Sequence, residues 1–205
     1  MHKLIAPAIL ALALAVPAAA ETRNHSGFDG VAVQDRIRVE VSLGQSYSVD
    51  VSGSDAARVR TRVQDGTLRI SDRNRPLFGG SPRLDAVVRV VVPELDRLAA
   101  SRGAEVRATD ISAHDFSVAA STGGEVRLTG ACHSLSASAS MGGIISAERF
   151  ACADADVAAS MGGEANVAAS ASYAAAASMG GLIDIRGEGA RGEIATSMGG
   201  EVRRN

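Results

Sequence analysis

A six-residue motif that begins with serine recurs six times in the second half of the chain. The copies are S-R-G-A-E-V from Ser101, S-T-G-G-E-V from Ser121, S-M-G-G-I-I from Ser140, S-M-G-G-E-A from Ser160, S-M-G-G-L-I from Ser178 and S-M-G-G-E-V from Ser197. Successive serines are 20, 19, 20, 18 and 19 residues apart. This period matches one coil of a β-solenoid and is shorter than the helical repeats. The motif therefore predicts a stack of similar coils.

Apolar and polar residues alternate on both sides of each motif. After the glycine pair, one phase is apolar in every copy and holds Val106, Val126, Ile145, Ala165, Ile183 and Val202. A second alternating segment precedes each serine, with Phe116, Leu135 and Ala155 in its apolar phase. A period of two places one set inside and the other in water. We predict an all-β fold, a right-handed parallel β-helix with coils of about 19 residues.

The N-terminal end of the chain has the pattern of an export signal. Lys3 precedes the apolar stretch 4–16, and Ala18 to Ala20 supply an A-x-A cleavage site. We predict the following organisation, in which 28–205 is one continuous domain: a signal peptide over 1–20, a short linker over 21–27, an N-terminal β region over 28–98 that caps the solenoid, and β-helix repeats over 99–205.

Charge and hydropathy argue against a nucleic-acid partner and against a membrane-spanning segment. The chain has 21 Lys and Arg against 23 Asp and Glu, a formal net charge of −2, whereas nucleic-acid binding normally requires a basic patch. After the signal peptide, no segment is long and apolar enough to span a bilayer. We therefore predict no nucleic-acid partner, no transmembrane segment after signal cleavage, and a location in the periplasm, at the cell surface or outside the cell.

Three short segments in the first half carry a family resemblance. They are F-D-G-V-A-V from Phe28, D-G-T-L-R-I from Asp65 and V-V-V-P-E-L from Val90. Together with the recurring serine motif, they make residues 28–202 similar to the putative auto-transporter adhesin head GIN domain family. The resemblance implies a β-helical fold without a defined activity.

Two cysteines and two histidines precede consecutive motifs at matching distances. Cys132 and Cys152 each lie eight residues before a motif serine, so they should stack on adjacent coils. Stacked cysteines in an oxidising compartment favour a disulfide, with free thiols or a metal site as alternatives. His114 and His133 should also lie over each other, next to the cysteines. Two His and two Cys could bind zinc or copper, but an exposed histidine pair needs no such role.

Four methionines occupy the second position of the motif, in the copies that read S-M-G-G. They are Met141, Met161, Met179 and Met198. Thioethers at the coil spacing could bind Cu(I), and the same column could serve as a contact surface for a partner or as packing beside the turns. We take the column as a candidate contact surface, and we predict no metal site and no cofactor.

No arrangement of a motif serine with a histidine and an acid resembles a catalytic triad, and the chain has no Trp and only two Tyr. We therefore predict no catalytic residues. The predicted function is that of an exported non-catalytic protein of the cell envelope or surface, an adhesin-like binding or structural module. Its partner is expected to be a macromolecule, an envelope glycan or a protein. The alternatives are a carbohydrate-active β-helix enzyme and a periplasmic copper- or zinc-binding protein.

Overall fold

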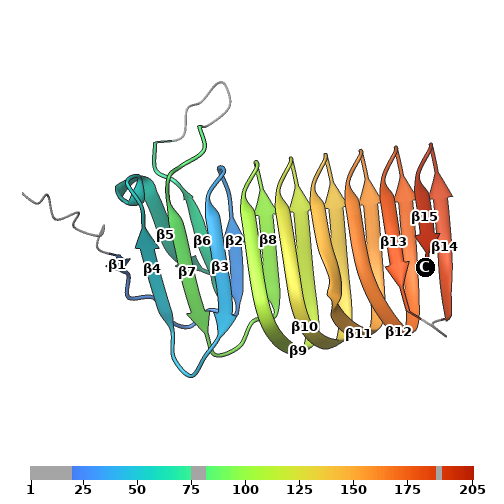
Figure 1. The fold of residues 1–205 in the computed structure, drawn as a ribbon, viewed down its shortest axis with the longest axis horizontal. Helices are drawn as coiled ribbons and strands as arrows, with labels where there is room; N and C mark the ends of the chain where they lie inside the picture. The colour runs from blue at the N-terminus through green and yellow to red at the C-terminus, as the bar shows by residue number, and fades with distance from the viewer. Residues whose placement is uncertain (1–19, 75–81, 188–190) are drawn as a thin grey trace, which may run out of the picture.

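The computed structural model describes residues 20–74, 82–187 and 191–205. Strands make up 69% of it and helix 2%, which confirms the all-β prediction. The strands lie side by side in one elongated stack, with the N-terminal half of the chain at one end and the C-terminus at the other (Figure 1). The predicted signal peptide falls outside the described residues, apart from Ala20.

Four long parallel strands form the centre of the stack. They are β9 (Glu105–Ser121), β10 (Glu125–Ser140), β11 (Ile144–Ser160) and β12 (Glu164–Ser178). Each bends between its two halves and so supplies both faces of a coil (Figure 1). Ser121 pairs with Ser140, and Ser140 with Ser160, so the motifs lie directly over one another. The predicted β-helix is confirmed as a β-solenoid.

The last coils continue the same register with shorter strands. They consist of β13 (Leu182–Arg186), β14 (Arg191–Ser197) and β15 (Glu201–Arg204). β13 and β14 pair in parallel with the two halves of β12, and β15 pairs with β13. The alanine-rich segment 173–177 lies within β12, so the coil phase prevails there over the helix propensity of alanine.

The core is a narrow column of small and β-branched side chains. All the inward residues predicted for the central coils are buried, including Val126, Ile145 and Ala165 with exposed fractions of 0%. Val202, in the last strand of the stack, is only half-buried. The alternation therefore predicts the inward phase correctly for the central coils, whereas Arg204, which the same phase places inside in the last strand, is exposed.

The motif forms a tight turn between coils. Residue 141 has φ +48° and Gly142 has φ +72°, and the Gly143 amide donates to the Ser140 carbonyl at 2.9 Å. Two positive φ angles in a row are the mark of a type I′ turn. The glycine after them is needed for a different reason: a Cβ on Gly143 would lie 2.2 Å from the Ala120 carbonyl oxygen of the neighbouring coil.

The N-terminal region differs from the expected cap, because five of its strands are layers of the solenoid itself. They are β2 (Gly30–Val33), β3 (Arg38–Leu43), β6 (Thr67–Asp72), β7 (Val87–Val92) and β8 (Arg97–Ser101). β2 pairs in parallel with β6 and β8, and β3 pairs in parallel with β7 and β9. The coil of β2 and β3 thus lies between two coils that come later in the chain.

A turn without glycine joins β2 to β3, so this coil does not carry the glycine-containing motif of the later coils. Asp35 and Arg36 have φ +67° and +56°, close to the +53° and +75° of Arg102 and Gly103 in the next layer. The Arg36 amide donates to the Arg102 carbonyl at 3.2 Å, so the two turns are stacked. The region 28–98 therefore extends the parallel stack.

Three antiparallel strands lie at the N-terminal end of the stack, beyond the layer formed by β6 and β7. They are β1 (Glu21–Thr22), β4 (Ser48–Ser52) and β5 (Val59–Gln64), with the short 3-10 helix η1 (Ala56–Arg58) before β5. β4 pairs with β7, and β5 with β6. β1 pairs with β4, and Arg23 donates to the Val59 carbonyl at 2.6 Å. The segment 21–27, expected as a linker, is thus hydrogen-bonded to the sheet at its start.

Candidate functional site

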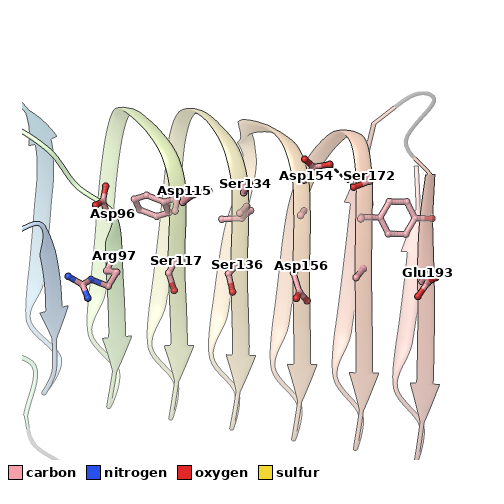
Figure 2. A pocket seen from close by; sticks show the side chains of 15 residues that line it. Asp96, Arg97, Asp115, Ser117, Ser134, Ser136, Asp154, Asp156, Ser172 and Glu193 are labelled. Carbon is pink, nitrogen blue, oxygen red and sulfur yellow. Dashed lines mark hydrogen bonds between the residues drawn. The ribbon is translucent and has the colours of Figure 1, made fainter.

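A shallow groove of about 690 Å³ runs along the solenoid axis across one face (Figure 2). It is lined by Asp96, Arg97, Asp115, Phe116, Ser117, Ser134, Leu135, Ser136, Asp154, Ala155, Asp156, Ser172, Tyr173, Ala174 and Glu193. These residues come from the start of β8, the second halves of β9 to β12, and β14. The groove therefore crosses six neighbouring layers, which at about 4.8 Å per strand is a length of about 24 Å.

Two outward columns form the walls of the groove. Register pairing places Asp115, Ser134, Asp154, Ser172 and Arg191 in one column, and the column two positions further along the strands holds Arg97, Ser117, Ser136, Asp156, Ala174 and Glu193. Figure 2 shows the two columns as parallel rows of side chains. Between them lie Phe116, Leu135, Ala155 and Tyr173, which are buried in the core. In the central layers, from β9 to β12, the short Asp, Ser and Ala side chains of both walls leave the backbone between them as the floor.

The groove is strongly acidic. Its lining includes five carboxylates, from Asp96, Asp115, Asp154, Asp156 and Glu193, against one guanidinium from Arg97. Arg97 donates to Asp29 Oδ1 at 2.5 Å, and this hydrogen bond and the charge of Asp29 raise the pKa of Arg97 above its ordinary value. The charge of Arg97 is thus directed to Asp29, and the carboxylates dominate the groove.

Hydroxyl groups add hydrogen-bonding capacity beside the carboxylates. Ser172 Oγ donates to Asp154 Oδ1 at 2.5 Å, which links β12 to β11 across the wall. Ser117, Ser134 and Ser136 supply further hydroxyls on the neighbouring layers. Each hydroxyl can both donate and accept, whereas an ionised carboxylate accepts only. The groove can therefore receive several hydrogen bonds from a ligand rich in donors.

The predicted histidine pair stands beside one wall of this groove. The ring centroids of His114 and His133 are 4.9 Å apart, which confirms that the two side chains stack. His114 Nδ1 lies 3.3 Å from Asp115 Oδ2, and His133 Nε2 lies 3.9 Å from Asp154 Oδ2. The histidines are exposed and so line the outer side of the acidic column.

The cysteines next to the histidines form the predicted disulfide, between Cys132 and Cys152. A disulfide sulfur is not a thiolate, so the alternative of a four-ligand site with two Cys and two His is wrong. Among residues 20–74, 82–187 and 191–205, no cluster of three or more His, Cys, Asp or Glu side chains has the geometry to hold a metal ion.

The methionine column lies on a different part of the coils, at the turns. The four side chains have the exposed fractions 51% for Met141, 47% for Met161, 46% for Met179 and 72% for Met198. All four have positive φ, between +46° and +49°. Met141, Met161 and Met179 are therefore about half covered by their neighbours, and Met198 is covered less, so the column lies at the edge of the stack and outside the core. Packing beside the turns and contact with a partner both stay predictions for this column.

Sequence reasoning did not identify the groove. The alternation predicts an inward phase with Phe116, Leu135 and Ala155, but it does not predict that the outward residues on either side of them form a groove. The signal that could have found the site is the recurrence of Asp and Ser at the positions just before and just after each of those inward residues.

A family model described as the head GIN domain of a putative auto-transporter adhesin matches residues 27–189. The chain belongs to this family. The match covers the N-terminal layers and most of the coils that carry the groove. The matched segment thus includes β2, β3 and β6 to β8 together with the coils from β9 to β13, which agrees with the parallel pairing of all these strands.

A solved structure shares the fold of this head GIN domain. A putative adhesin from Bacteroides fragilis superimposes with a TM-score of 0.67 at 13% identity, over 91% of this chain and 96% of that one. A putative adhesin from Parabacteroides merdae gives a TM-score of 0.48 at 14% identity, over 92% and 96%. At 13% identity, the likeness to the Bacteroides fragilis protein shows the fold alone. None of the curated proteins compared with the chain matches it.

In the described part of the chain, no helix combines the length and the apolar character that crossing a bilayer requires.

Proposed function

We propose that this protein is a non-catalytic, adhesin-like module of the cell envelope or surface that holds an extended glycan in the groove of β8 to β14. Membership of an adhesin family supports the binding role. The observation that carries the proposal is the groove itself, which keeps one outward column in register over six layers and a second over five.

The shape of the groove favours a linear polymer over a compact ligand. It is open along its length and has a wall on each side. Each layer presents a carboxylate or a hydroxyl at nearly every position of the two columns, repeated at the strand spacing of about 4.8 Å. A chain of similar units laid along the axis would meet the same kind of group in each layer, so many weak contacts would add up.

The charge of the groove narrows the class of polymer. Five carboxylates repel acidic chains, and their oxygens accept hydrogen bonds from hydroxyl and amino groups. An acidic polymer in the groove would place its negative charges next to these carboxylates without a counter-charge, and this repulsion disfavours it as a partner. The fitting ligand is therefore a neutral or amino-bearing glycan.

The disulfide supports the extracytoplasmic part of the proposal. Disulfides persist in oxidising compartments such as the periplasm and the cell surface. Cys132 and Cys152 are the only cysteines of the chain, and they are joined to each other. This pairing and the export signal predicted over residues 1–20 both fit an exported envelope protein.

Binding to immobilised polymers tests the proposal. The panel contains neutral, amino-bearing and acidic polysaccharides of matched length, together with basic and acidic peptides. We expect binding to neutral or amino-bearing glycans, weaker binding at high salt for the amino-bearing ones, and none to acidic chains. Preference for acidic polymers, or for peptides over every glycan, would contradict the proposed ligand class. Shortening of a bound polysaccharide over time would contradict the non-catalytic role.

A further inference from the structure

Every methionine of the chain beyond Met1 occupies the same structural position. The chain has five methionines, and the other four are residues 141, 161, 179 and 198 of the S-M-G-G turns. Met is an adaptable filler of irregular cores, yet none of these four lies in the core. The turns of successive coils form one edge of the stack (Figure 1). We call these four side chains the methionine ladder.

The turn itself does not require methionine. The same position holds Arg102 and Thr122 in the two preceding coils, with φ of +53° and +50°. Positive φ is uncommon for residues other than Gly, Asn and Asp, so Met is not chosen for its backbone preference. A plain apolar contact would be served as well by Leu, which does not occur at any of the six positions. What the four residues share is the thioether sulfur.

Backbone hydrogen bonds join the turns of neighbouring coils, so successive turns lie over one another. The carbonyl of Met141 accepts from the Gly123 amide at 3.2 Å, and the carbonyl of Met179 accepts from the Gly162 amide at 3.2 Å. Ser178 pairs with Ser197, so the turns of Met179 and Met198 are also neighbours. Adjacent rungs are thus about 4.8 Å apart. The flexible methionine side chains can bring the sulfurs of neighbouring rungs to one ion.

We propose that the methionine ladder is a binding site for a soft monovalent metal ion, Cu(I), held between the thioethers of neighbouring coils. Thioethers are soft, neutral ligands, which select Cu(I) and discriminate against Zn²⁺, Ca²⁺ and Mg²⁺. The proposal goes beyond the proposed function and does not depend on it. On each strand the ladder residue lies five positions beyond the groove residue, as Met161 does beyond Asp156.

Methyl NMR of the methionines tests the site directly. The disulfide-bonded protein is labelled with [methyl-13C]methionine, and each ladder signal is assigned by its loss in one Met→Leu variant. Ag(I), a redox-inert substitute, is then titrated, and Cu(I) is added in ascorbate without oxygen. We expect both ions to shift the ladder signals and Zn²⁺ to leave them unchanged. Unshifted signals with Ag(I) and Cu(I) would overturn the proposal.

A variant with all four Met→Leu changes is the matched control, because Leu keeps the apolar size and removes the sulfur. Cu(I) binding is measured by competition with a chromogenic Cu(I) chelator. We expect the variant to keep the thermal unfolding midpoint of the natural protein and to lose Cu(I) binding. Equal Cu(I) affinity in the two proteins would overturn the proposal. The methyl titration of the natural protein decides the matter if the variant does not fold.

Discussion

Cys132 lies directly opposite Cys152 in the parallel ladder between β10 and β11, with 4.5 Å between their Cα atoms and a disulfide between their sulfurs. The bond joins two consecutive coils at the corner where the strands bend, beside the stacked histidines. It therefore cross-links the part of the stack that carries the acidic wall of the groove.

Replacement of both cysteines by alanine should lower the free energy of unfolding by about 2–4 kcal/mol, because the unfolded chain is no longer closed into a loop. The sequence separation of the two cysteines is 20 residues. Urea unfolding with and without a reductant checks this. The reductant should destabilise the natural protein and leave the double variant unchanged. A double variant as stable as the oxidised natural protein would contradict the expected role of the bond.

Two adjacent glycines of one turn should respond differently to alanine. A Cβ on Gly163 would lie 2.4 Å from the Ala139 carbonyl oxygen, so Gly163→Ala forces the coils apart and should cost about 1–3 kcal/mol. Gly162 has φ +72° and open space around it, so Gly162→Ala should cost only the strain of the backbone, about 1 kcal/mol. Thermal unfolding of the two variants gives the comparison. The reverse order would show that the coils are not packed as described.

The buried carboxylate of Asp35 connects three layers of the stack. It is 2% exposed and accepts from Arg102 Nε at 2.9 Å and from the Asp72 amide at 3.3 Å. Asp35→Ala leaves both donors without this acceptor and should cost about 1–3 kcal/mol, while Asp35→Asn keeps an acceptor and tolerates the positive φ, so it should cost less. Chemical denaturation measures both. Equal losses would mean that the hydrogen bonds contribute little.

Glu105 should make a small, pH-dependent contribution to stability. Burial raises the pKa of Glu105, but the hydrogen bond from Arg38 and the charges of Arg83 and Arg38 outweigh it and hold the pKa below its ordinary value of 4.5. A lowered pKa gives stability that is complete above the unfolded value and is lost as the pH falls through the folded value.

Glu105→Gln should therefore lower the free energy of unfolding at pH 7 by under about 1 kcal/mol, since the ion pairs are partly exposed. The difference from the natural protein should vanish well below the ordinary pKa of 4.5 and shrink in high salt. Urea unfolding across the acid range checks both effects. A difference that persists in acid would assign the contribution to packing.

Periodicity was enough to predict the central coils. The spacing of the serine motifs predicts that Ser140 lies over Ser160, as observed. The alternation predicts that Val126 and Ile145 are buried, because a strand has two faces and the face that packs on the core must be apolar. It was not enough for the N-terminal layers. There, Asp35 and Arg36 adopt the turn conformation without glycine. The layers also stack out of chain order, and no local pattern encodes that order.

The groove was harder to predict than the core for a physical reason. Inward positions must be apolar, so the fold restricts which residue types can occupy them. Outward positions accept any residue whose side chain water can solvate. Asp156, Ser136 and Ala174 share a column but not a residue type. The depth of the groove depends on all of them having short side chains, which becomes visible once the register is known.

Obstruction of the groove is the most direct test of the binding account. Ala174 lies in the groove between Asp156 and Glu193, and Ala176 is an exposed outward residue two positions along the same strand, outside the groove. Binding of Ala174→Arg and Ala176→Arg to the preferred glycan and to the native envelope fraction is measured alongside thermal unfolding. The account predicts that both variants fold, that Ala174→Arg loses binding and that Ala176→Arg keeps it. Undiminished binding by Ala174→Arg, or equal loss in both variants, would contradict it.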